Sequence, residues 1–499
     1  MNILLAISPI LLVLIGMTIL KKPAMLVAPI AMVYTWIIAI LFFNADVAMV
    51  VGQTKSGIVE GLKIILLIFS AFVILQLMTR TGAIEKVKAV LADITDDRRA
   101  QLIIIAIMFA IFLEGAAGAG SPAAIAAPFL VGLGFNPVTA AACALLGDAT
   151  PASWGGAGVT TIMGLGGVSD YMSPAQASAM VGRFHMFGVM IVPTLALLLA
   201  FGRKGFKGIW PFLIYASVVL CLLDFFISNF IGPELVSLGT GLLAILFSVA
   251  FLKVVKLKTP DEYLYHAPKE KSALLNKYSA LQAFGPYLVL AILLPLVRYT
   301  LVANYWGVMT KYGYIVWVGG VIFLSSYIGS LILKVPFLEY ASCLKSAGKS
   351  VLPAMITICT LVVVSNLMKN SGMIMLMAQA GADVAGNLYP PVAVAIGSLG
   401  AFITGTGLGS NIMFAPMHVE AAMQLALNPI VVCAGQNAGA ALGNLICPNN
   451  VVAAAITVGL IGQEGEVMKK VFPPFFVIIA LYMVLSLLYS IYLFPNFGM

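Results

Sequence analysis

Long uninterrupted apolar runs constrain the fold of this chain more than any other feature. A helix needs about 20 mainly apolar residues to cross the hydrocarbon core of a bilayer. Ten segments meet that requirement: residues 3–20, 24–43, 58–79, 180–201, 209–229, 232–253, 280–302, 314–334, 350–369 and 472–494. Because lipid offers the backbone no hydrogen-bond partners, such a chain is expected to be an all-α protein that crosses the membrane many times.

Composition and motifs exclude most other classes. Of the 499 residues, 62% are hydrophobic and 9% are charged, whereas a soluble domain carries roughly 25% charged residues. The net charge of +8 lies in short loops without an aromatic-rich basic stripe, so no nucleic-acid partner is expected. No HExxH, GxSxG or Walker A motif is present, which argues against an enzyme, a resident cofactor and an ATP-driven pump.

The cysteines show no metal or disulfide spacing. None forms a CxxC pair, so we expect packing residues and no metal site. They are Cys143, Cys221, Cys343, Cys359, Cys433 and Cys447.

Two apolar regions, residues 101–168 and 391–463, are interrupted by glycines, prolines and small polar residues. Interruptions of this kind predict half-helices and re-entrant hairpins rather than smooth spans. The lysines and arginines of the loops can all be cytoplasmic if both termini lie outside and each broken region makes one net crossing. The two regions then run in opposite directions, which predicts an inverted repeat.

Two short matches support the repeat. Phe112-Leu-Glu-Gly115 is similar to Phe402-Ile-Thr-Gly405, and the segment ending in Pro137 is similar to the one ending in Pro429. We therefore expect about 12 to 14 transmembrane segments in two inverted repeats with broken helices and re-entrant hairpins. The boundaries are residues 1–208 for the first repeat, 209–279 for linker spans and a cytoplasmic loop, and 280–499 for the second repeat. Corresponding broken segments of this kind indicate a transporter site near the midplane.

Glu114 is the carboxylate of the first broken region and is expected near mid-bilayer. An ionised group there costs about 2.5–3.5 kcal/mol on insertion scales. Glu114 should therefore be partnered or protonated part of the time, as a proton carrier would be. The alternative is a neutral side chain bonded to nearby backbone.

The glycine loops offer helix amino termini, which bind carboxylates through unpaired amides. Ser121-Pro122 is a helix-start signal, and Thr150-Pro151 repeats it. The loop beginning at Gly405 is the expected counterpart in the second half. The alternative reading is helix packing by small residues.

Amides and an acid follow these loops. Asp148 is a second candidate for the proton, coupled to Glu114, or for coordinating Na⁺ with unwound carbonyls. The amides could read a hydroxyl or carboxylate oxygen, or merely join helices; they are Gln436, Asn437, Asn444, Asn449 and Asn450. The predicted proton-coupling residues are Glu114 and Asp148. The predicted substrate-binding residues are Gly115, Gly118, Gly120, Ser121, Thr150, Thr404, Gly405, Ser410, Asn411, Gln436 and Asn437.

Other intramembrane polar residues are expected to be structural. Arg183 and His185 lie near the outer start of a span and read as interfacial anchors, with a proton relay as the alternative for His185. His418 and Glu420 are expected in a solvated turn.

The run from Glu114 to Pro128, with its EGAAGxGSP core, resembles the L-lactate permease family of bacterial proton-coupled symporters, as does Thr150-Pro151. The resemblance implies import of a short 2-hydroxymonocarboxylate (L-lactate, D-lactate or glycolate) with a proton across the inner (cytoplasmic) membrane. Three positions depart from the family pattern: Ala119 replaces an aromatic residue, Ser121 a common threonine, and Asp148 a usual amide. The alternatives are a sodium-coupled carrier of another small carboxylate and, more remotely, an intramembrane enzyme. The oligomeric state is not predicted.

Overall fold

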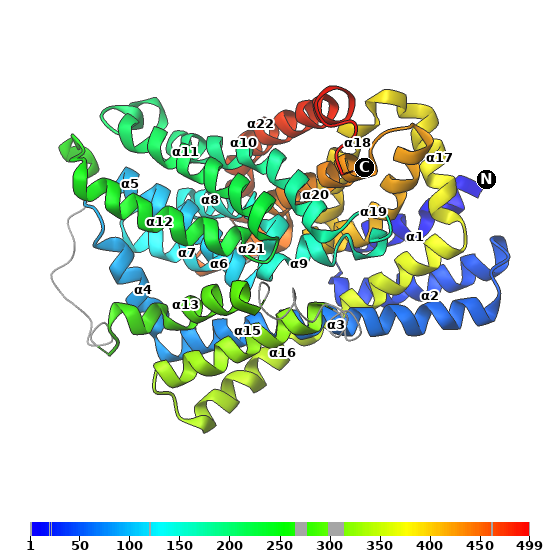
Figure 1. Ribbon diagram of the computed structural model, residues 1–499, viewed down its shortest axis with the longest axis horizontal. Helices are drawn as coiled ribbons and strands as arrows, with labels where there is room; N and C mark the ends of the chain where they lie inside the picture. The colour runs from blue at the N-terminus through cyan, green and yellow to red at the C-terminus, as the bar shows by residue number, and fades with distance from the viewer. Residues whose placement is uncertain are drawn as a thin grey trace.

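The computed structural model describes residues 2–18, 20, 22–118, 121–264, 277–297, 314–460 and 463–498. Within these ranges the chain is helical, and the one β-bridge joins Asp97 and Leu264. All ten predicted spans contain helices, which are labelled in Figure 1: α1 (Asn2–Thr18), α2 (Ala24–Phe42), α3 (Val47–Thr81), α10 (Pro174–Phe201), α11 (Trp210–Phe226), α12 (Val236–Val254), α13 (Ala280–Leu296), α15 (Tyr314–Ile332), α16 (Phe337–Asn370) and α22 (Glu464–Leu488).

Nine helices of the described residues are long and apolar enough to cross a membrane, or ten if one bent pair counts as a span. Three of the predicted spans, α1, α13 and α15, are apolar but contribute shorter stretches. The protein is therefore a multi-pass membrane protein. Short 3₁₀ and π segments join or extend these helices: η3 (Gly166–Val168), η4 (Gly202–Phe206), η5 (Ile227–Ile231), η6 (Asp261–Tyr263), η9 (Gly386–Leu388) and η10 (Tyr489–Leu493).

The two longest helices, α3 and α16, form an antiparallel pair along the lower side of Figure 1. Glycines allow their backbones to touch. A Cβ at Gly57 would lie 2.8 Å from the Cα of Val363, and one at Gly61 would lie 2.7 Å from the Cα of Cys359. A side chain at either position would force the helices apart, so small residues set their separation.

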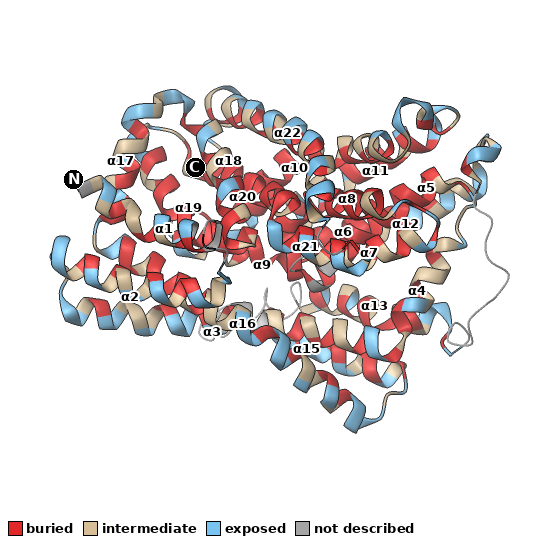
Figure 2. Cartoon of the chain, turned by 180° about the vertical axis from the view of Figure 1, so that it is seen from behind, coloured by how far each residue is buried: buried red, intermediate tan, exposed pale blue. Residues whose placement is uncertain are grey.

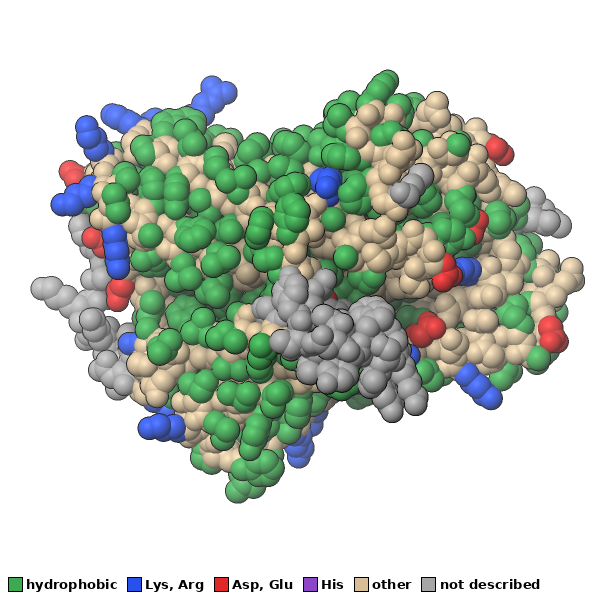
Figure 3. Space-filling model, viewed as in Figure 1, with side chains coloured by type: hydrophobic (Ala, Val, Ile, Leu, Met, Phe, Trp, Pro, Cys, Tyr) green, Lys and Arg blue, Asp and Glu red, His purple; other side chains and the backbone are tan. Residues whose placement is uncertain are grey.

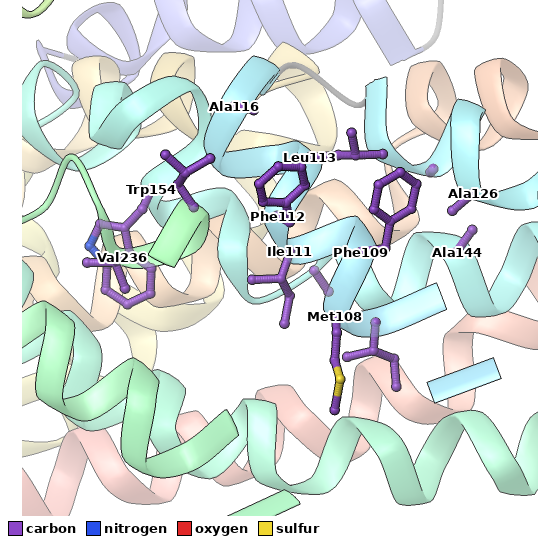
Figure 4. Close-up of a cluster of buried hydrophobic side chains, with 14 of the residues drawn as sticks. Met108, Phe109, Ile111, Phe112, Leu113, Ala116, Ala126, Ala144, Trp154 and Val236 are labelled. Carbon is purple, nitrogen blue, oxygen red and sulfur yellow. The ribbon is translucent and has the colours of Figure 1, made fainter. Parts of the chain in front are cut away.

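The first broken region occupies the centre of the molecule. It comprises α5 (Arg98–Leu102), the π-helix η1 (Ile103–Phe109), α6 (Ala110–Ala117), α7 (Ser121–Gly132), α8 (Pro137–Asp148), the 3₁₀ segment η2 (Pro151–Trp154) and α9 (Gly155–Ile162). The apolar window of Arg98–Ala116 is 100% buried, and Figure 2 shows α6 and α8 among the most buried elements. Figure 4 shows Trp154 and Val236 on one side of α6 and Ala126 and Ala144 on the other. Protein, not lipid, therefore surrounds this span.

The second broken region begins after α17 (Met373–Ala385). It comprises α18 (Tyr389–Thr404), α19 (Gly407–Gln424), α20 (Pro429–Ile446) and α21 (Pro448–Thr457). Helices α18 and α19 form an antiparallel hairpin, in which the Ser410 hydroxyl donates to the carbonyl of Gly397 (2.8 Å). Helices α20 and α21 meet at a bend of 41°. The predicted half-helices and hairpins are thus present in both regions.

Both regions present the same order of features. Each has a glycine with positive φ between two helices, Gly118 at 64° and Gly405 at 82°. The second helix after this glycine begins with an asparagine cap followed by proline: the side chain of Asn136 accepts from amides in the first turn of α8, and Asn428 does so for α20. This order agrees with the predicted repeat, while the inverted relation itself stays a prediction.

Helices α18 and α20 meet along a glycine seam, which we define as Gly435, Gly439 and Gly443 of α20. A Cβ at Gly439 would lie 3.0 Å from the Cα of Val394, and one at Gly443 would lie 3.0 Å from the carbonyl carbon of Ser398. Spacing of four residues places all three glycines on one face of α20. The two backbones are therefore in direct contact.

A buried ion pair joins three loops at one end of the molecule. Arg99 Nη2 lies 2.6 Å from Asp97 Oδ2, and both side chains are almost fully buried. Arg99 also donates to the carbonyl of Lys207 (2.6 Å), while Thr259 donates to Asp97 (2.7 Å). In the view of Figure 3, lysine and arginine side chains gather toward this end, and Figure 1 places both termini toward the other end.

Candidate functional site

A cavity of about 120 Å³ lies where the two broken regions meet the long helices α3 and α16. Its volume is several times the roughly 10–15 Å³ that one water requires. The residues that line it are Ile68, Phe72, Glu114, Gly118, Ala152, Gly155, Gly156, Val159, Thr160, Ala354, Ile358, Gly405, Thr406, Gly407, Leu408, Asn444 and Asn450. The predicted residues Glu114, Gly118 and Gly405 therefore share one cavity.

Glu114 and Asp148 form a buried carboxyl pair. Their side chains are 4% and 3% exposed, and the two carboxyl groups lie within hydrogen-bonding reach of one another. Because two like charges at this separation repel strongly, the pair is stable only if it holds a proton. Glu114 Oε2 and Asp148 Oδ1 are buried and have no hydrogen-bond partner in the part of the chain that the structure describes. A buried carboxyl pair of this kind therefore lies beside the cavity, and its role in proton coupling stays a prediction.

A left-handed turn forms the wall beside Glu114. Gly156, Ala157 and Gly158 have φ values of 55°, 57° and 83°. Ala157 costs roughly 1–2 kcal/mol in this conformation because its Cβ crowds the backbone. A Cβ at Gly155 would overlap Glu114 Oε1 and lie 3.0 Å from its Cδ. The backbone itself therefore packs against the carboxyl group, and no side chain separates them.

The amino terminus of α19 faces the cavity. Thr406 caps the helix by accepting from the Gly409 amide (3.0 Å), as the predicted helix start requires. The following residues, Gly407 and Leu408, line the cavity, and first-turn amides have no intrahelical partner. The positive end of the helix dipole is thus available to a carboxylate.

The other predicted helix starts differ from one another. Helix α7 begins at Ser121 as predicted, but the side chain of Ser121 and the whole of Gly120 lie outside the described residues. The helix start expected at Thr150 is wrong, because its side chain makes no capping bond and the segment that follows is a four-residue 3₁₀ turn. A turn that short has no helix dipole comparable with that of α19. A role of Thr150 in substrate binding stays a prediction.

Four predicted binding residues lie behind the cavity wall, where they bond to one another. Gln436 Nε2 donates to Ser410 Oγ (3.0 Å), and Asn411 Nδ2 donates to Asn437 Oδ1 (3.0 Å). Asn411 Nδ2 also donates to the carbonyl of Thr160 (3.2 Å), which lines the cavity. These side chains therefore support the cavity wall through hydrogen bonds made on the side away from the cavity.

Two further predicted residues serve local packing. Gly115 faces α12, where a Cβ would lie 2.7 Å from the Cα of Leu238. The Thr404 hydroxyl donates to the carbonyl of Gly400 within its own helix (2.8 Å).

His185 and His418 are buried, so the predicted interfacial anchor and solvated turn are wrong for them. His418 Nε2 lies 2.9 Å from Gln436 Oε1, and its Nδ1 lies 2.8 Å from the Tyr389 hydroxyl. Because Gln436 Oε1 can only accept, His418 Nε2 must carry the hydrogen. His185 is held in the same manner, by Ser153 and the hydroxyl of Tyr482, each at 2.7 Å.

Sequence reasoning missed Thr160, which lines the cavity. Asn444 and Asn450, considered only among the possible amides, line it as well. The contributions of α3 and α16 are apolar and carry no sequence signal for a site. These residues line the cavity because α3 and α16, which are far apart in the sequence, pack against each other.

Comparisons with known proteins agree with the predicted resemblance. The model of the L-lactate permease family matches residues 2–307 and 299–494. Glycolate permease GlcA of Escherichia coli is 26% identical over 94% of this chain and 92% of its own length. The L-lactate permease of Bacillus subtilis is 28% identical over 87% of this chain and 86% of its own. The L-lactate permease of Streptococcus iniae is 29% identical over 87% of this chain and 94% of its own.

A solved structure shares the fold. MtrF of Neisseria gonorrhoeae, described as one of a class of antimetabolite efflux pumps, aligns over 95% of this chain and 96% of its own with a TM-score of 0.52 and 13% identity. Because the sequence identity is low, the similarity to MtrF concerns the arrangement of helices alone. The family match covers nearly the whole length. The chain belongs to the L-lactate permease family, which is a family of transporters and not of enzymes.

Proposed function

We propose that this protein imports a short 2-hydroxymonocarboxylate (L-lactate, D-lactate or glycolate) together with a proton across the bacterial inner membrane. The observation that carries the proposal is the buried Glu114–Asp148 pair beside a cavity that also receives the amino terminus of α19. The names of the relatives, lactate permeases and a glycolate permease, support the same class of substrate.

Each part of the site has a role in this proposal. The first-turn amides of α19 bind the substrate carboxylate without a buried arginine. A proton taken up by the Glu114–Asp148 pair offsets the negative charge of the substrate. The loaded site then gains no net charge, so its passage through the low-dielectric core avoids the cost of moving an ion.

The architecture that we propose for transport is a pair of inverted repeats, residues 1–208 and 280–499, joined by residues 209–279. Rocking of one repeat against the other would expose a midplane site to each side in turn. The basic end of the molecule is assigned to the cytoplasm because lysine and arginine are retained there. Both termini then lie outside.

Uptake of labelled L-lactate into proteoliposomes tests the function. One proton per monocarboxylate makes each pH unit, about 1.36 kcal/mol, worth a tenfold accumulation. We expect an inward proton gradient to drive uptake that a protonophore abolishes and that does not need Na⁺, with glycolate and D-lactate competing and succinate not. Uptake that requires Na⁺ and ignores the pH gradient would select a sodium-coupled carrier instead.

Glu114→Gln tests the role of the carboxyl pair. The variant should lose pH-driven accumulation but retain exchange of labelled for unlabelled lactate, because exchange needs no net proton movement. Glu60→Gln, which changes an exposed carboxylate on α3, is the control and should behave as wild type. Normal pH-driven accumulation by Glu114→Gln refutes the assignment.

A further inference from the structure

Two residues that line the cavity each carry a buried oxygen atom with no hydrogen-bond partner among the described residues: Glu114 (Oε2) and Asn444 (Oδ1). A buried acceptor that finds no donor costs about 1–3 kcal/mol. Glu114 has an explanation, because its carboxyl group can hold the proton that it shares with Asp148. Asn444 does not titrate, and an occupant of the cavity is the candidate donor for its oxygen.

The backbone around Asn444 is held in place while its amide is left free for a ligand. Its carbonyl accepts from Asn450 Nδ2 (3.1 Å), a bond that crosses the break between α20 and α21. Asn444 belongs to the last turn of α20, and Asn450, in the first turn of α21, also lines the cavity. The Asn444 side chain therefore extends from a helix end that is fixed in position. A fixed position favours a specific contact with a ligand.

The chemistry of the missing partner can be read from the acceptor. A carboxylate has only acceptor oxygens and cannot satisfy Asn444 Oδ1, whereas a hydroxyl can. In a 2-hydroxy acid the hydroxyl and one carboxylate oxygen lie on adjacent carbons. The oxygen and nitrogen of one amide match that pair: Oδ1 accepts from the hydroxyl while Nδ2 donates to the carboxylate oxygen.

We propose that Asn444 is the residue that selects the 2-hydroxyl group of the substrate, with its amide bridging the hydroxyl and the carboxylate. The second carboxylate oxygen is left for the amides of Gly407 and Leu408 at the start of α19. An acid without the hydroxyl leaves Asn444 Oδ1 unsatisfied, and sites built around such a bond reject the analogue strongly. The inference rests on the proposed function, because it assigns a contact to the substrate of that site.

The test compares L-lactate with propionate, the three-carbon acid that lacks the hydroxyl. Initial rates of proton-driven uptake of each labelled acid are measured in proteoliposomes to obtain kcat/KM. The proteins are wild type, Asn444→Leu, which keeps the approximate size but has no acceptor, and Asn370→Leu, which removes an exposed amide at the end of α16. We expect wild type and Asn370→Leu to prefer lactate by on the order of tenfold to a hundredfold.

Asn444→Leu should abolish that preference by lowering kcat/KM for lactate while propionate uptake stays within about threefold of wild type. Retained propionate uptake also shows that the variant is folded. An unchanged lactate preference, or equal losses for both acids, overturns the proposal. If Asn444→Leu transports neither acid, the smaller Asn444→Ser decides in the same way, since a serine side chain is too short to bridge the two groups.

Uptake by the wild-type protein distinguishes failure of this inference from failure of the proposed function. Wild type that takes up neither acid refutes the function. Wild type that takes up lactate and propionate equally well keeps carboxylate transport but refutes a role for Asn444 in selecting the hydroxyl.

Discussion

Replacement of Gly241 by alanine tests the contact that holds the central helix in place. Gly241 lies on α12 and faces the helix that carries Glu114. A Cβ there would lie 2.6 Å from the Cα of Phe112 and 2.7 Å from the carbonyl oxygen of Met108. Ordinary contacts begin at 3.4 Å, so the nearer one is about 0.8 Å too short. Both obstacles are backbone atoms that no rotamer change can move, so α12 and α6 must separate.

The expected cost follows from two opposing effects. Overpacking a core of this kind costs about 1–3 kcal/mol, whereas replacing a helical glycine by alanine gains up to about 1 kcal/mol. Gly241→Ala should therefore destabilise the protein by about 1–2 kcal/mol. Gly239, two residues away on the same helix, is a matched control because a Cβ there meets only the Cδ1 of Ile227, at 2.9 Å, and that side-chain end can turn away. Gly239→Ala should be neutral or slightly stabilising.

The cysteines provide the assay. All six are free and buried, so a fluorogenic thiol reagent reports unfolding of the detergent-solubilised protein on heating. For a chain of this length each kcal/mol shifts the melting temperature by roughly 1–2 °C, extrapolating from smaller domains. Gly241→Ala should melt a few degrees below Gly239→Ala. Equal melting temperatures, or a higher one for Gly241→Ala, would refute the close approach of α12 to α6.

Two further substitutions test the wall of the cavity and the buried ion pair. Gly155→Ala places a Cβ against the carboxyl group of Glu114. Because this flexible carboxyl group can move, the stability of the protein should change little. Its displacement should nevertheless lower pH-driven lactate uptake about tenfold or more. Gly166→Ala, with open space around it, should leave uptake unchanged, and wild-type uptake by both variants would contradict the geometry. Arg99→Met leaves Asp97 charged and buried without its partner and should destabilise the protein by about 3–5 kcal/mol; an unchanged melting temperature in the thiol assay would exclude that role.

The helices of this protein could be predicted from sequence because each lipid-spanning run is long and nearly free of charge. The breaks could be predicted as well, because Pro151 and Pro448 interrupt otherwise apolar segments. Which helices pack against one another could not be predicted from sequence. Helices α3 and α16 meet through Gly57 and Gly61, which look like any other small residues of a membrane helix until the opposite backbone is seen.

The candidate site, too, could be predicted from sequence only in part. Glu114 and Asp148 could be singled out because a charge in mid-membrane is costly. The choice among the amides could not be made: Gln436 and Asn437 lie two turns before Asn444 on α20, and only the depth and rotation of that helix decide which of them reaches the cavity. His418 was misplaced because α19 continues to Gln424, which keeps the histidine inside a buried helix instead of a turn.

The glycine seam between α18 and α20 has a mechanical consequence. Helices that interlock through large side chains can shift along one another only if many rotamers change together, and close packing makes that costly. At Gly439 and Gly443 the glycines themselves carry no side chain, and α20 meets mainly the backbone of α18, with the Cβ of Ala401 as a further neighbour of Gly443. Contacts of this kind are weak and repeat along the helix axis. Movement of α18 along this seam would therefore change few side-chain rotamers, but movement of the whole hairpin of α18 and α19 would have to break the hydrogen bonds that join Ser410 and Asn411 of α19 to α20.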